Sequence, residues 1–373
     1  MTKPRQGNLI VAVLLIGVLL CHCGGNANST YTTNVSGTIL MSGLRNGQNT
    51  NTFSPIDNVQ EYVMVAAGDS HVLVLDITGT VYAFGSNYYG QLGDNTNTDS
   101  TLPVRVLGLS RATKVATGIY HSVALLANGE AWTWGENEFG KLGDGTNVNR
   151  SLPIKVIGLN NVIDIAGGYD HSLALKSDGT VWAWGSNRYG NLGDGTTDDR
   201  YSPVQVLNLN NVVAVTAGSN SSWALKRDGS VWGWGMTRYL TFEYDYTPRR
   251  IDGLNGITKI FAGHYHFFAM ADNNTLWGWG RNDYGELGDG TTAPKDNPVQ
   301  INGLQGIISI AAGNQHTIAL LNDGTLRSWG NNAYGQLGIG SFYDAIVPAY
   351  IDNVSRIFMV AARSDYSLVL KTK

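Results

Sequence analysis

The sequence predicts an all-β fold, a seven-bladed β-propeller made of four-stranded antiparallel blades. Three observations predict it. The pattern Ala-Gly-x-x-His-x-x-Ala-Leu returns about every 50 residues, a period typical of one structural unit copied many times. A second pattern, Gly-Thr-Val-x-x-x-Gly with small variations, begins at seven positions. No stretch of the chain shows the sustained apolar stripe of period 3.6 that an amphipathic helix needs.

Each copy predicts four short strands, and the third copy shows them most clearly. Residues 162–166 are apolar and β-branched, and residues 171–176 alternate in polarity as a strand does. Residues 177–179, Ser-Asp-Gly, predict a tight turn into the Trp-rich third strand, residues 180–185. After a longer loop, residues 203–207 form the fourth strand, with a proline at its start. One such meander buries its faces only by packing against neighbouring copies.

The two ends of the chain complement one another. The first strand pattern, residues 38–43, matches a third strand, and the chain finishes with two strands at residues 357–361 and 366–370. In the last copy Arg363 replaces the repeated glycine and Tyr366 replaces the histidine. We therefore expect the seventh blade to combine both ends, which closes the ring and removes open sheet edges.

The third copy resembles the regulator of chromosome condensation repeat over residues 171–175, 178–187 and 189–195. The resemblance covers about residues 36–373 and implies a propeller fold. That family includes a nuclear exchange factor for a small GTPase, many interaction scaffolds and a secreted bacterial propeller that inhibits β-lactamases. Because one fold hosts many functions, the resemblance alone leaves the function open.

The N-terminus predicts export. Lys3 and Arg5 precede an apolar segment, residues 9–21, that is short for a spanning helix. We expect a signal peptide over residues 1–23, a flexible linker over residues 24–35 and the propeller over residues 36–373. The segment around Cys21 and Cys23 looks like a bacterial lipoprotein start, where a cysteine carries the lipid. An uncleaved membrane anchor is the alternative.

Without the leader the chain carries 23 basic and 29 acidic residues, a net charge of −6. Nucleic-acid binding requires a basic face, so this balance argues against a nucleic-acid partner. Export also disfavours a nuclear exchange factor as the leading interpretation. We predict a monomer that contacts a membrane only through an N-terminal lipid anchor.

The repeated polar and aromatic residues are expected to be structural. The histidines at 71, 121, 171, 266 and 316 are interpreted as fastening their own blades through backbone hydrogen bonds, against the alternative of a metal site. The Gly-Asp-Gly-Thr loops predict turns held by aspartate, against calcium or phosphate binding. The Trp pairs predict packing, against a sugar platform. No cofactor fingerprint or catalytic order is found, so we predict no enzyme and no cofactor.

Function is expected where the copies differ. In an antiparallel meander the Gly-x-x-His loop and the loop after the third strand emerge on the same face, and the two residues inside Gly-x-x-His vary freely. The fourth complete copy departs furthest, with Ser221 in place of histidine and an aromatic and arginine-rich segment over residues 236–250. Tyr and Arg are enriched in protein-binding hot spots. The predicted protein-binding residues are Tyr120, Tyr169, Asp170, Asn220, Arg238, Tyr239, Phe242, Tyr244, Tyr246, His264, Tyr265 and Gln315.

The sequence therefore predicts a non-catalytic protein-binding scaffold that is exported, either as a lipid-anchored protein of the bacterial cell envelope or as a periplasmic or secreted protein. Two alternatives stay open: an exchange factor for a small GTPase, and an enzyme-inhibiting propeller that resembles the secreted β-lactamase inhibitor. A drifted blade whose shortened loop repacked with aromatic residues is the structural explanation of residues 236–250.

Overall fold

The computed structural model describes residues 36–45, 48–56, 61–352 and 354–372. The predicted signal peptide (1–23) and linker (24–35), with Cys21 and Cys23, lie outside the described residues. Within them the fold is all-β, as predicted, with one short 3₁₀ segment, η1 (Glu138–Gly140).

The strands fall into repeated groups of four, which we number as blades 1 to 6. Blade 1 comprises β3 (Tyr62–Ala67), β4 (His71–Asp76), β5 (Val81–Gly85) and β6 (Ser100–Arg105). Blade 2 comprises β7 (Ala112–Thr117), β8 (His121–Leu126), β9 (Ala131–Gly135) and β10 (Arg150–Lys155). Blade 3 comprises β11 (Val162–Gly167), β12 (His171–Lys176), β13 (Val181–Gly185) and β14 (Arg200–Gln205).

The second half of the chain continues the pattern. Blade 4 comprises β15 (Val212–Ala217), β16 (Ser221–Lys226), β17 (Val231–Met236) and β18 (Tyr244–Arg250). Blade 5 comprises β19 (Ile257–Ala262), β20 (His266–Ala271), β21 (Leu276–Gly280) and β22 (Lys295–Ile301). Blade 6 comprises β23 (Ile307–Ala312), β24 (His316–Leu321), β25 (Leu326–Gly330) and β26 (Ala345–Tyr350). The remaining strands, called the terminal strands, are β27 (Ile357–Arg363), β28 (Tyr366–Thr372), β1 (Gly37–Arg45) and β2 (Gln48–Pro55).

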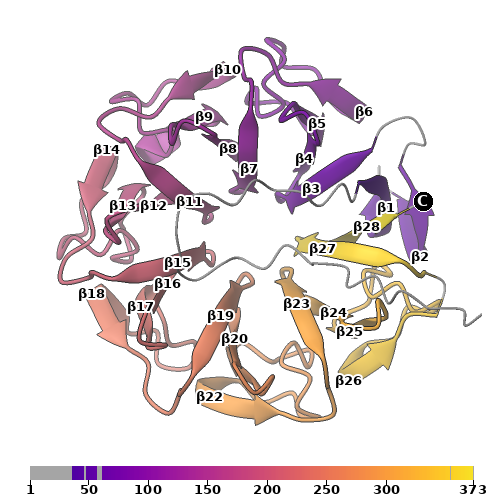
Figure 1. Cartoon of the computed structure of the whole chain (residues 1–373). Helices are drawn as coiled ribbons and strands as arrows, with labels where there is room; N and C mark the ends of the chain where they lie inside the picture. Colours follow the sequence, from indigo (N-terminus) through magenta and orange to yellow (C-terminus); the bar gives the residue numbers. More distant parts are fainter. Residues whose placement is uncertain (1–35, 46–47, 57–60, 353, 373) are drawn as a thin grey trace, which may run out of the picture.

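The sheets stand around a common centre, with the first strand of each group innermost (Figure 1). Blades 2 to 6 are separate four-stranded antiparallel sheets. Blade 1 and the terminal strands form one eight-stranded sheet, joined where Gly37 pairs with Tyr62. Within the described residues no sheet closes on itself into a barrel. The prediction of four-stranded antiparallel blades is confirmed, and a closed seven-bladed ring stays a prediction.

The two ends of the described chain meet in the terminal strands. β1 pairs with β28 over seven residue pairs, from Gly37 opposite Thr372 to Gly43 opposite Tyr366. Arg363 donates its Nε–H to Asp69 at 2.9 Å, and the Tyr366 hydroxyl donates to the Gly68 carbonyl at 2.5 Å. Residues nearly 300 positions apart therefore hold the terminal strands against blade 1.

The fourth strand of each blade begins earlier than the sequence suggests. In blade 3 it spans Arg200–Gln205, so Pro203 lies inside the strand rather than at its start. The strand is the outermost of its sheet, where a residue without an N–H is tolerated because half of the backbone groups have no neighbour. The aspartate-held turns are as expected: the Asp144 carboxylate accepts from the Thr146 backbone N–H at 3.0 Å and from its hydroxyl at 2.7 Å.

The repeated histidines join neighbouring blades. His71 Nε2 lies 2.8 Å from Ser122 Oγ in the next blade, and His121, His171, His266 and His316 each lie 2.9 Å from the equivalent hydroxyl. The Ser122 hydroxyl donates to the Gln91 carbonyl at 2.8 Å, so Nε2 of His71 carries the proton and donates to Oγ. The expectation that each histidine bonds the backbone of its own blade is corrected: the partner is a side chain of the next blade.

The repeated glycine before each histidine follows from this packing. A Cβ at Gly118 would lie 2.0 Å from the His121 ring, and one at Gly168 equally close to the His171 ring. A residue larger than glycine would displace the imidazole. The last copy has no histidine, and there the glycine position is free to carry Arg363.

A second contact joins most blades at the same level. The loop after the third strand reaches the next blade, and a buried indole of that blade donates to a backbone carbonyl of the loop. Trp134 Nε1–H donates to the Gln91 carbonyl at 2.8 Å, and Trp184 Nε1–H donates to the Lys141 carbonyl at 2.8 Å. Apolar clusters lie between blades rather than inside one sheet. The cluster between blades 3 and 4, for example, includes Leu175, Val181, Ala224 and Trp234.

Candidate functional site: the loop face

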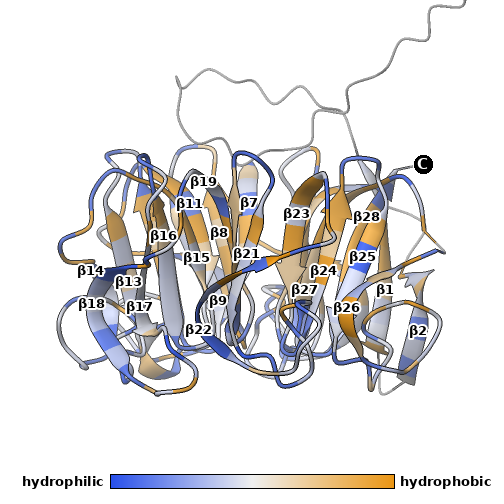
Figure 2. Cartoon of the chain, turned by 90° about the horizontal axis from the view of Figure 1, so that it is seen from below, coloured by the Kyte–Doolittle hydropathy of each residue, from blue (hydrophilic) through white to orange (hydrophobic). Residues whose placement is uncertain are grey.

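Two sets of loops share one face of the disc. The Gly-x-x-His loops connect the first and second strands of each blade, and the longer loops connect the third and fourth strands. In side view the longer loops gather on one face of the disc and the C-terminus lies on the opposite face (Figure 2). We call the face with the longer loops the loop face and the opposite one the turn face.

Backbone hydrogen bonds connect the centre of the loop face from blade to blade. The N–H of Ile119 donates to the Tyr169 carbonyl at 3.2 Å, and Tyr169 N–H to the Ser219 carbonyl at 3.1 Å. Ser219 N–H donates to the His264 carbonyl at 3.0 Å. These donors and acceptors belong to the first variable residue of each loop. These residues thus use their backbones for the scaffold. The side chains of Ile119 and Ser219 are buried, whereas those of Tyr169 and His264 are partly exposed.

Five predicted binding residues form one continuous chain of rings. The ring centroids of Tyr169 and His264 lie 5.5 Å apart, and those of His264 and Tyr265 4.5 Å apart. Tyr265 lies 6.1 Å from Tyr239, which lies 6.0 Å from Phe242. The chain runs from the central loops to Phe242, whose side chain is 56% exposed. Sequence separation gave no reason to link blade 3 with residues 239–242, and the structure brings them together.

Polar contacts hold this chain of rings in place. The Tyr239 hydroxyl donates to the Asp283 carboxylate at 3.0 Å, and Asn220 Nδ2 lies 3.4 Å from the Tyr265 hydroxyl. Gln315, with its amide oxygen turned toward blade 5, accepts from the Arg281 guanidinium at 3.1 and 3.2 Å. The neighbours are fixed by the fold, so the aromatic surface is preorganised.

The irregular segment of blade 4 supplies the outer part of the face. Only residues 237–243 separate β17 from β18, whereas residues 186–199 separate the equivalent strands of blade 3. Arg238 and Glu243 form an ion pair, and the ring centroids of Tyr244 and Tyr189 lie 5.2 Å apart. Tyr246 packs against Gly190, where a Cβ would lie 2.6 Å from its ring.

The shortened loop has a structural cost at the junction of blades 4 and 5. Trp279, the indole equivalent to Trp184, is buried, and its Nε1–H has no hydrogen-bond partner among the described residues. Ser221 cannot span the junction as a histidine does, and Phe267 occupies the slot of the hydroxyl partner. The rings of Trp223 and Phe267 instead pack at a centroid distance of 4.3 Å. These rings lie outside residues 236–250, the segment for which the sequence suggested aromatic repacking.

Tyr120 and Asp170 contact neighbouring blades rather than the chain of rings. Tyr120 packs against Tyr89 of blade 1 at 5.1 Å. Asp170 contacts the ammonium of Lys141, which is fully buried and also lies 2.5 Å from the Glu136 carboxylate. Much of the Asp170 carboxylate is thus used by the fold. The binding role of all twelve predicted residues stays a prediction.

Burial sets the protonation of the central groups. Burial lowers the pKa of His264 to about 3, with smaller effects from Arg363, His266 and Arg281. Burial raises the pKa of Tyr169 to about 12, with the Asp69 charge adding to it. Both side chains are neutral near pH 7, which suits them to packing and hydrogen bonding.

Sequence reasoning missed a set of buried charges on this face. One repeated pair, five residues apart at the start of the long loop, reads Glu136 and Lys141 in blade 2 but Arg281 and Glu286 in blade 5. Burial raises the pKa of Glu286 to about 7, against the lowering effect of Arg281. Aligning the copies would have shown the reversed polarity.

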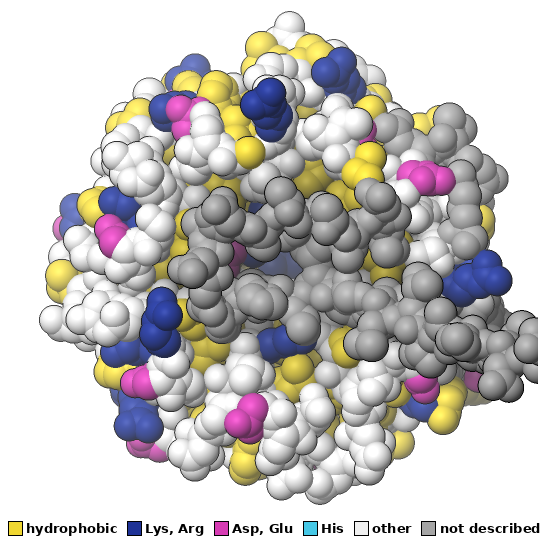
Figure 3. All heavy atoms as spheres, in the orientation of Figure 1, with side chains coloured by type: hydrophobic (Ala, Val, Ile, Leu, Met, Phe, Trp, Pro, Cys, Tyr) yellow, Lys and Arg dark blue, Asp and Glu magenta, His cyan; other side chains and the backbone are white. Residues whose placement is uncertain are grey.

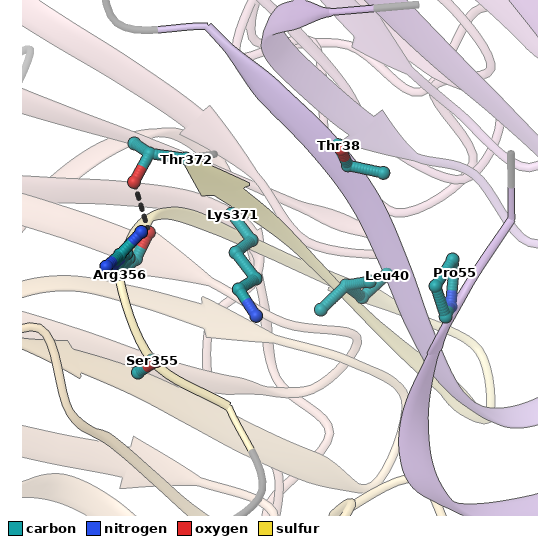
Figure 4. Close-up of a pocket in the computed structure, with 7 residues that line it drawn as sticks. All are labelled: Thr38, Leu40, Pro55, Ser355, Arg356, Lys371 and Thr372. Atoms are coloured by element: carbon teal, nitrogen blue, oxygen red, sulfur yellow. Dashed lines mark hydrogen bonds between the residues drawn. The ribbon is translucent and has the colours of Figure 1, made fainter. Parts of the chain in front are cut away.

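The turn face has fewer features that indicate a binding site. Acidic and basic side chains are interspersed over the part that is visible, without one dominant sign (Figure 3). A pocket of about 430 Å³ lies where the terminal strands meet, and Arg356 and Lys371 line it with Thr38, Leu40, Pro55, Ser355 and Thr372 (Figure 4). The Thr372 hydroxyl donates to the Arg356 carbonyl at 3.4 Å.

The part of the chain that the structure describes contains no group of three or more His, Cys, Asp or Glu side chains placed to hold a metal ion. It likewise contains no helix of the length and apolarity that a membrane crossing requires.

Comparison with known proteins identifies the family. The RCC1-like domain model matches residues 7–242, and models of the regulator of chromosome condensation (RCC1) repeat match residues 273–320 and 323–370, or 257–286 and 307–336. The E3 ubiquitin-protein ligase highwire of Drosophila melanogaster is 52% identical over 44 residues, 12% of this chain and 1% of that protein. The chain thus matches only a small part of that curated relative.

Two solved structures share the fold. Prp20p of Saccharomyces cerevisiae superposes with a TM-score of 0.81 and 23% identity, covering 91% of this chain and 93% of that one. Human WBSCR16 superposes with a TM-score of 0.81 and 23% identity, covering 90% and 99%. The predicted resemblance is confirmed: the chain belongs to the RCC1-like domain family, built from regulator of chromosome condensation repeats.

Proposed function

We propose that this chain is a non-catalytic protein-binding propeller that recognises its partner through the loop face. The observation that carries the proposal is the chain of rings from Tyr169 to Phe242. It begins at the repeat's variable positions and ends in the one segment that abandons the repeat. Tyrosine contributes a large contact area with few rotatable bonds, and arginine contributes a planar guanidinium, and both are enriched in binding hot spots.

Exposure supports the same surface. Leu240, Phe242 and Tyr246 are 55%, 56% and 44% exposed, and they lie within seven residues of one another. Single exposed apolar residues are ordinary, whereas a cluster beside polar neighbours is typical of an interaction site. Polar residues border this cluster, among them Arg238, Glu243 and Asp283.

The scaffold that presents this surface is proposed to be a closed ring of seven blades, the seventh built from β27, β28, β1 and β2. The pairing of β1 with β28 and the contacts of Arg363 and Tyr366 with blade 1 support the proposal. Closure leaves no blade without a neighbour on either side.

Export and lipidation at Cys21 or Cys23 belong to the same proposal, and they rest on the basic start and apolar segment of residues 1–23. Cell fractionation tests them. Recovery of the mature chain in envelope or secreted fractions supports export, and recovery of an uncleaved chain in the cytoplasm contradicts it. Fatty-acid labelling that is lost in the double variant Cys21→Ala/Cys23→Ala supports lipidation.

An exchange factor for a small GTPase and an enzyme-inhibiting propeller remain the alternatives. The structure of Prp20p was described together with its binding to Gsp1p and histones. At 23% identity this neighbour supports the fold of the present chain and leaves its partner open. Acceleration of nucleotide release from a captured GTPase would favour the first alternative, and inhibition of a captured enzyme the second.

Affinity capture from envelope extracts tests the binding surface. We expect residues 24–373 to retain a protein that the double variant Tyr239→Ala/Tyr244→Ala loses by about tenfold or more, in line with the loss of two hot-spot aromatics. Both side chains are partly exposed, so we expect the melting temperature to be nearly unchanged.

A double substitution on the turn face, Thr180→Ala/Thr275→Ala, provides the matched control. It removes two partly exposed turn side chains and leaves the loop face intact. Capture that is equal for the wild type and the Tyr239/Tyr244 variant would overturn the proposed surface.

A further inference from the structure

The loop face holds a second feature away from the chain of rings. A pocket of about 400 Å³ lies where blades 1, 2 and 3 meet, lined by Tyr89, Glu136, Glu138, Phe139, Asn147, Asn149 and Tyr201. Three rings and two carboxylates therefore surround one hollow. None of its lining residues is a lysine or arginine.

The charge around this pocket is unbalanced. Lys141 contacts both Glu136 and Asp170, so one ammonium faces two carboxylates below the pocket. Glu138 is exposed and forms no hydrogen bond or ion pair with another described residue. Arg150 and Arg200, which adjoin the lining residues Asn149 and Tyr201 in the sequence, are already paired, with Asp144 at 2.7 Å and with Asp194 at 2.6 Å. The negative field also raises the pKa of Tyr89, chiefly through Glu136.

The backbone beneath the pocket departs from the repeat. Phe139 has φ of 66°, a conformation that residues with a Cβ rarely adopt. Its equivalents Tyr89, Tyr189, Tyr284 and Tyr334 have no such positive φ among the described residues. Among these five positions the unusual turn is seen at Phe139 alone, and Tyr89 lines the pocket with ordinary backbone geometry. Strained backbone of this kind is common at binding sites, because the surrounding structure must hold it.

A neighbouring strand completes the wall. A Cβ at Gly140 would lie 2.5 Å from the Tyr201 backbone and 2.6 Å from its ring, so the glycine allows β14 to come close. Tyr201 is 42% exposed and presents its ring beside Phe139 and Glu138.

We infer that this pocket receives an arginine side chain of the protein partner. The inference rests on the proposed protein-binding function and states the chemistry that the partner presents. A guanidinium is planar, so it stacks on aromatic faces while its N–H groups donate to a carboxylate. A lysine ammonium would gain the charge attraction without the stacking or the fork-shaped pairing.

Ligand-observed NMR titration of purified residues 24–373 tests this with three probes. The peptides are acetyl-Gly-Arg-Gly-amide, its lysine counterpart, and its citrulline counterpart, which keeps the shape and lacks the charge. We expect the arginine peptide to bind in the millimolar range, the lysine peptide more weakly, and the citrulline peptide about tenfold more weakly than arginine.

Two variants locate the binding. Glu138→Gln removes the unpaired carboxylate, and Phe139→Gly removes the ring while relieving the positive φ. An unchanged melting temperature of each variant shows that a loss of binding does not come from a loss of folding. We expect each to weaken the arginine peptide about fivefold. The matched controls on the same face, Asp198→Asn and Tyr334→Ala, should leave it unchanged.

Equal binding of the arginine and citrulline peptides would overturn the inference, as would unchanged affinity in both pocket variants. Neither result bears on partner capture through Tyr239 and Tyr244, because the titration uses no partner. Conversely, failure of that capture experiment leaves the peptide measurement intact, so the two proposals fail separately.

Discussion

The junction between blades 2 and 3 and the junction between blades 4 and 5 solve the same packing problem differently. In the first, His121 Nε2 lies 2.9 Å from Ser172 Oγ and Trp184 donates to the Lys141 carbonyl at 2.8 Å. In the second, both bonds are absent among the described residues. The rings of Trp223, Phe267 and Trp279 take their place.

The difference shows that the departures occur as coupled sets. Where histidine becomes Ser221, its hydroxyl partner becomes Phe267, so neither side is left with an unmatched polar group. Burying one member of such a pair alone would cost about 1–3 kcal/mol. The buried Trp279 N–H is the exception, and it results from the loop that blade 4 lost. The same loss exposes the aromatic residues of the proposed binding surface.

The variant with the largest expected effect removes a junction made by the terminal strands. Deleting residues 364–373 takes away β28, the seven-pair partner of β1, and the Ser367 hydroxyl that His316 contacts at 2.9 Å. We expect the chain to lose cooperative folding, because β1 and β27 would both become open edges. Circular dichroism melts and gel filtration measure it. A soluble, cooperatively unfolding truncation would show that the junctions are independent.

Lowering the pH tests how all five histidine junctions together contribute to the stability of the fold. Burial lowers the pKa of His71, His171, His266 and His316 to about 3, and that of His121 well below its usual value. The unfolded chain takes up these protons below about pH 6.5 and the folded chain does not. The folded state should therefore lose about 1.4 kcal/mol per pH unit for each histidine as the pH falls from about 6.5 toward 3.

Glu286 acts in the opposite direction. Burial raises its pKa to about 7, so the folded chain holds a proton that the unfolded chain releases, and this group favours folding at lower pH. Its effect on the pH dependence of the unfolding free energy offsets the effect of roughly one of the five buried histidines. Melting temperatures at pH 7, 6 and 5 check the net effect. A flat profile over that range would mean that the histidines stay accessible to protons in the folded chain.

The smallest test compares the two kinds of junction directly. His171→Ala removes a buried ring and its bond to Ser222, and we expect a loss of about 3 kcal/mol of unfolding free energy. Ser221→Ala removes only the oxygen that accepts from Trp223 Nε1 at 3.0 Å, for about 1 kcal/mol. Urea titrations with and without a chelator measure both. Equal losses would erase the distinction, and a chelator-dependent loss would restore the metal interpretation of the histidines.

Periodicity made the fold predictable because each copy repeats the same local signals. The turn Asp178-Gly179 and the strand at 181–185 are recognisable without knowledge of their neighbours, since tight turns and strands depend on adjacent residues. The strand boundary at Arg200 was less accessible, because the edge position that tolerates Pro203 is a property of the assembled sheet.

The candidate site was predictable only in part. Tyr169, His264 and Tyr265 stood out as variable positions, and the structure places them in one chain of rings with Tyr239. Glu138 and Phe139 did not stand out. Their pocket depends on Tyr89 and Tyr201 from two other blades, and no spacing along the chain encodes that meeting.

By itself the sequence determined the unit: its length, its four strands, its turns and the positions that vary between copies. These follow from local backbone preference and from the repetition of one pattern. Only the tertiary structure decided what the repeated polar residues do. The histidine bonds a hydroxyl about 50 residues away and the indole bonds a carbonyl 43 residues away, because stacking around a common centre brings equivalent strands together. The same stacking decided which variable side chains meet on the loop face.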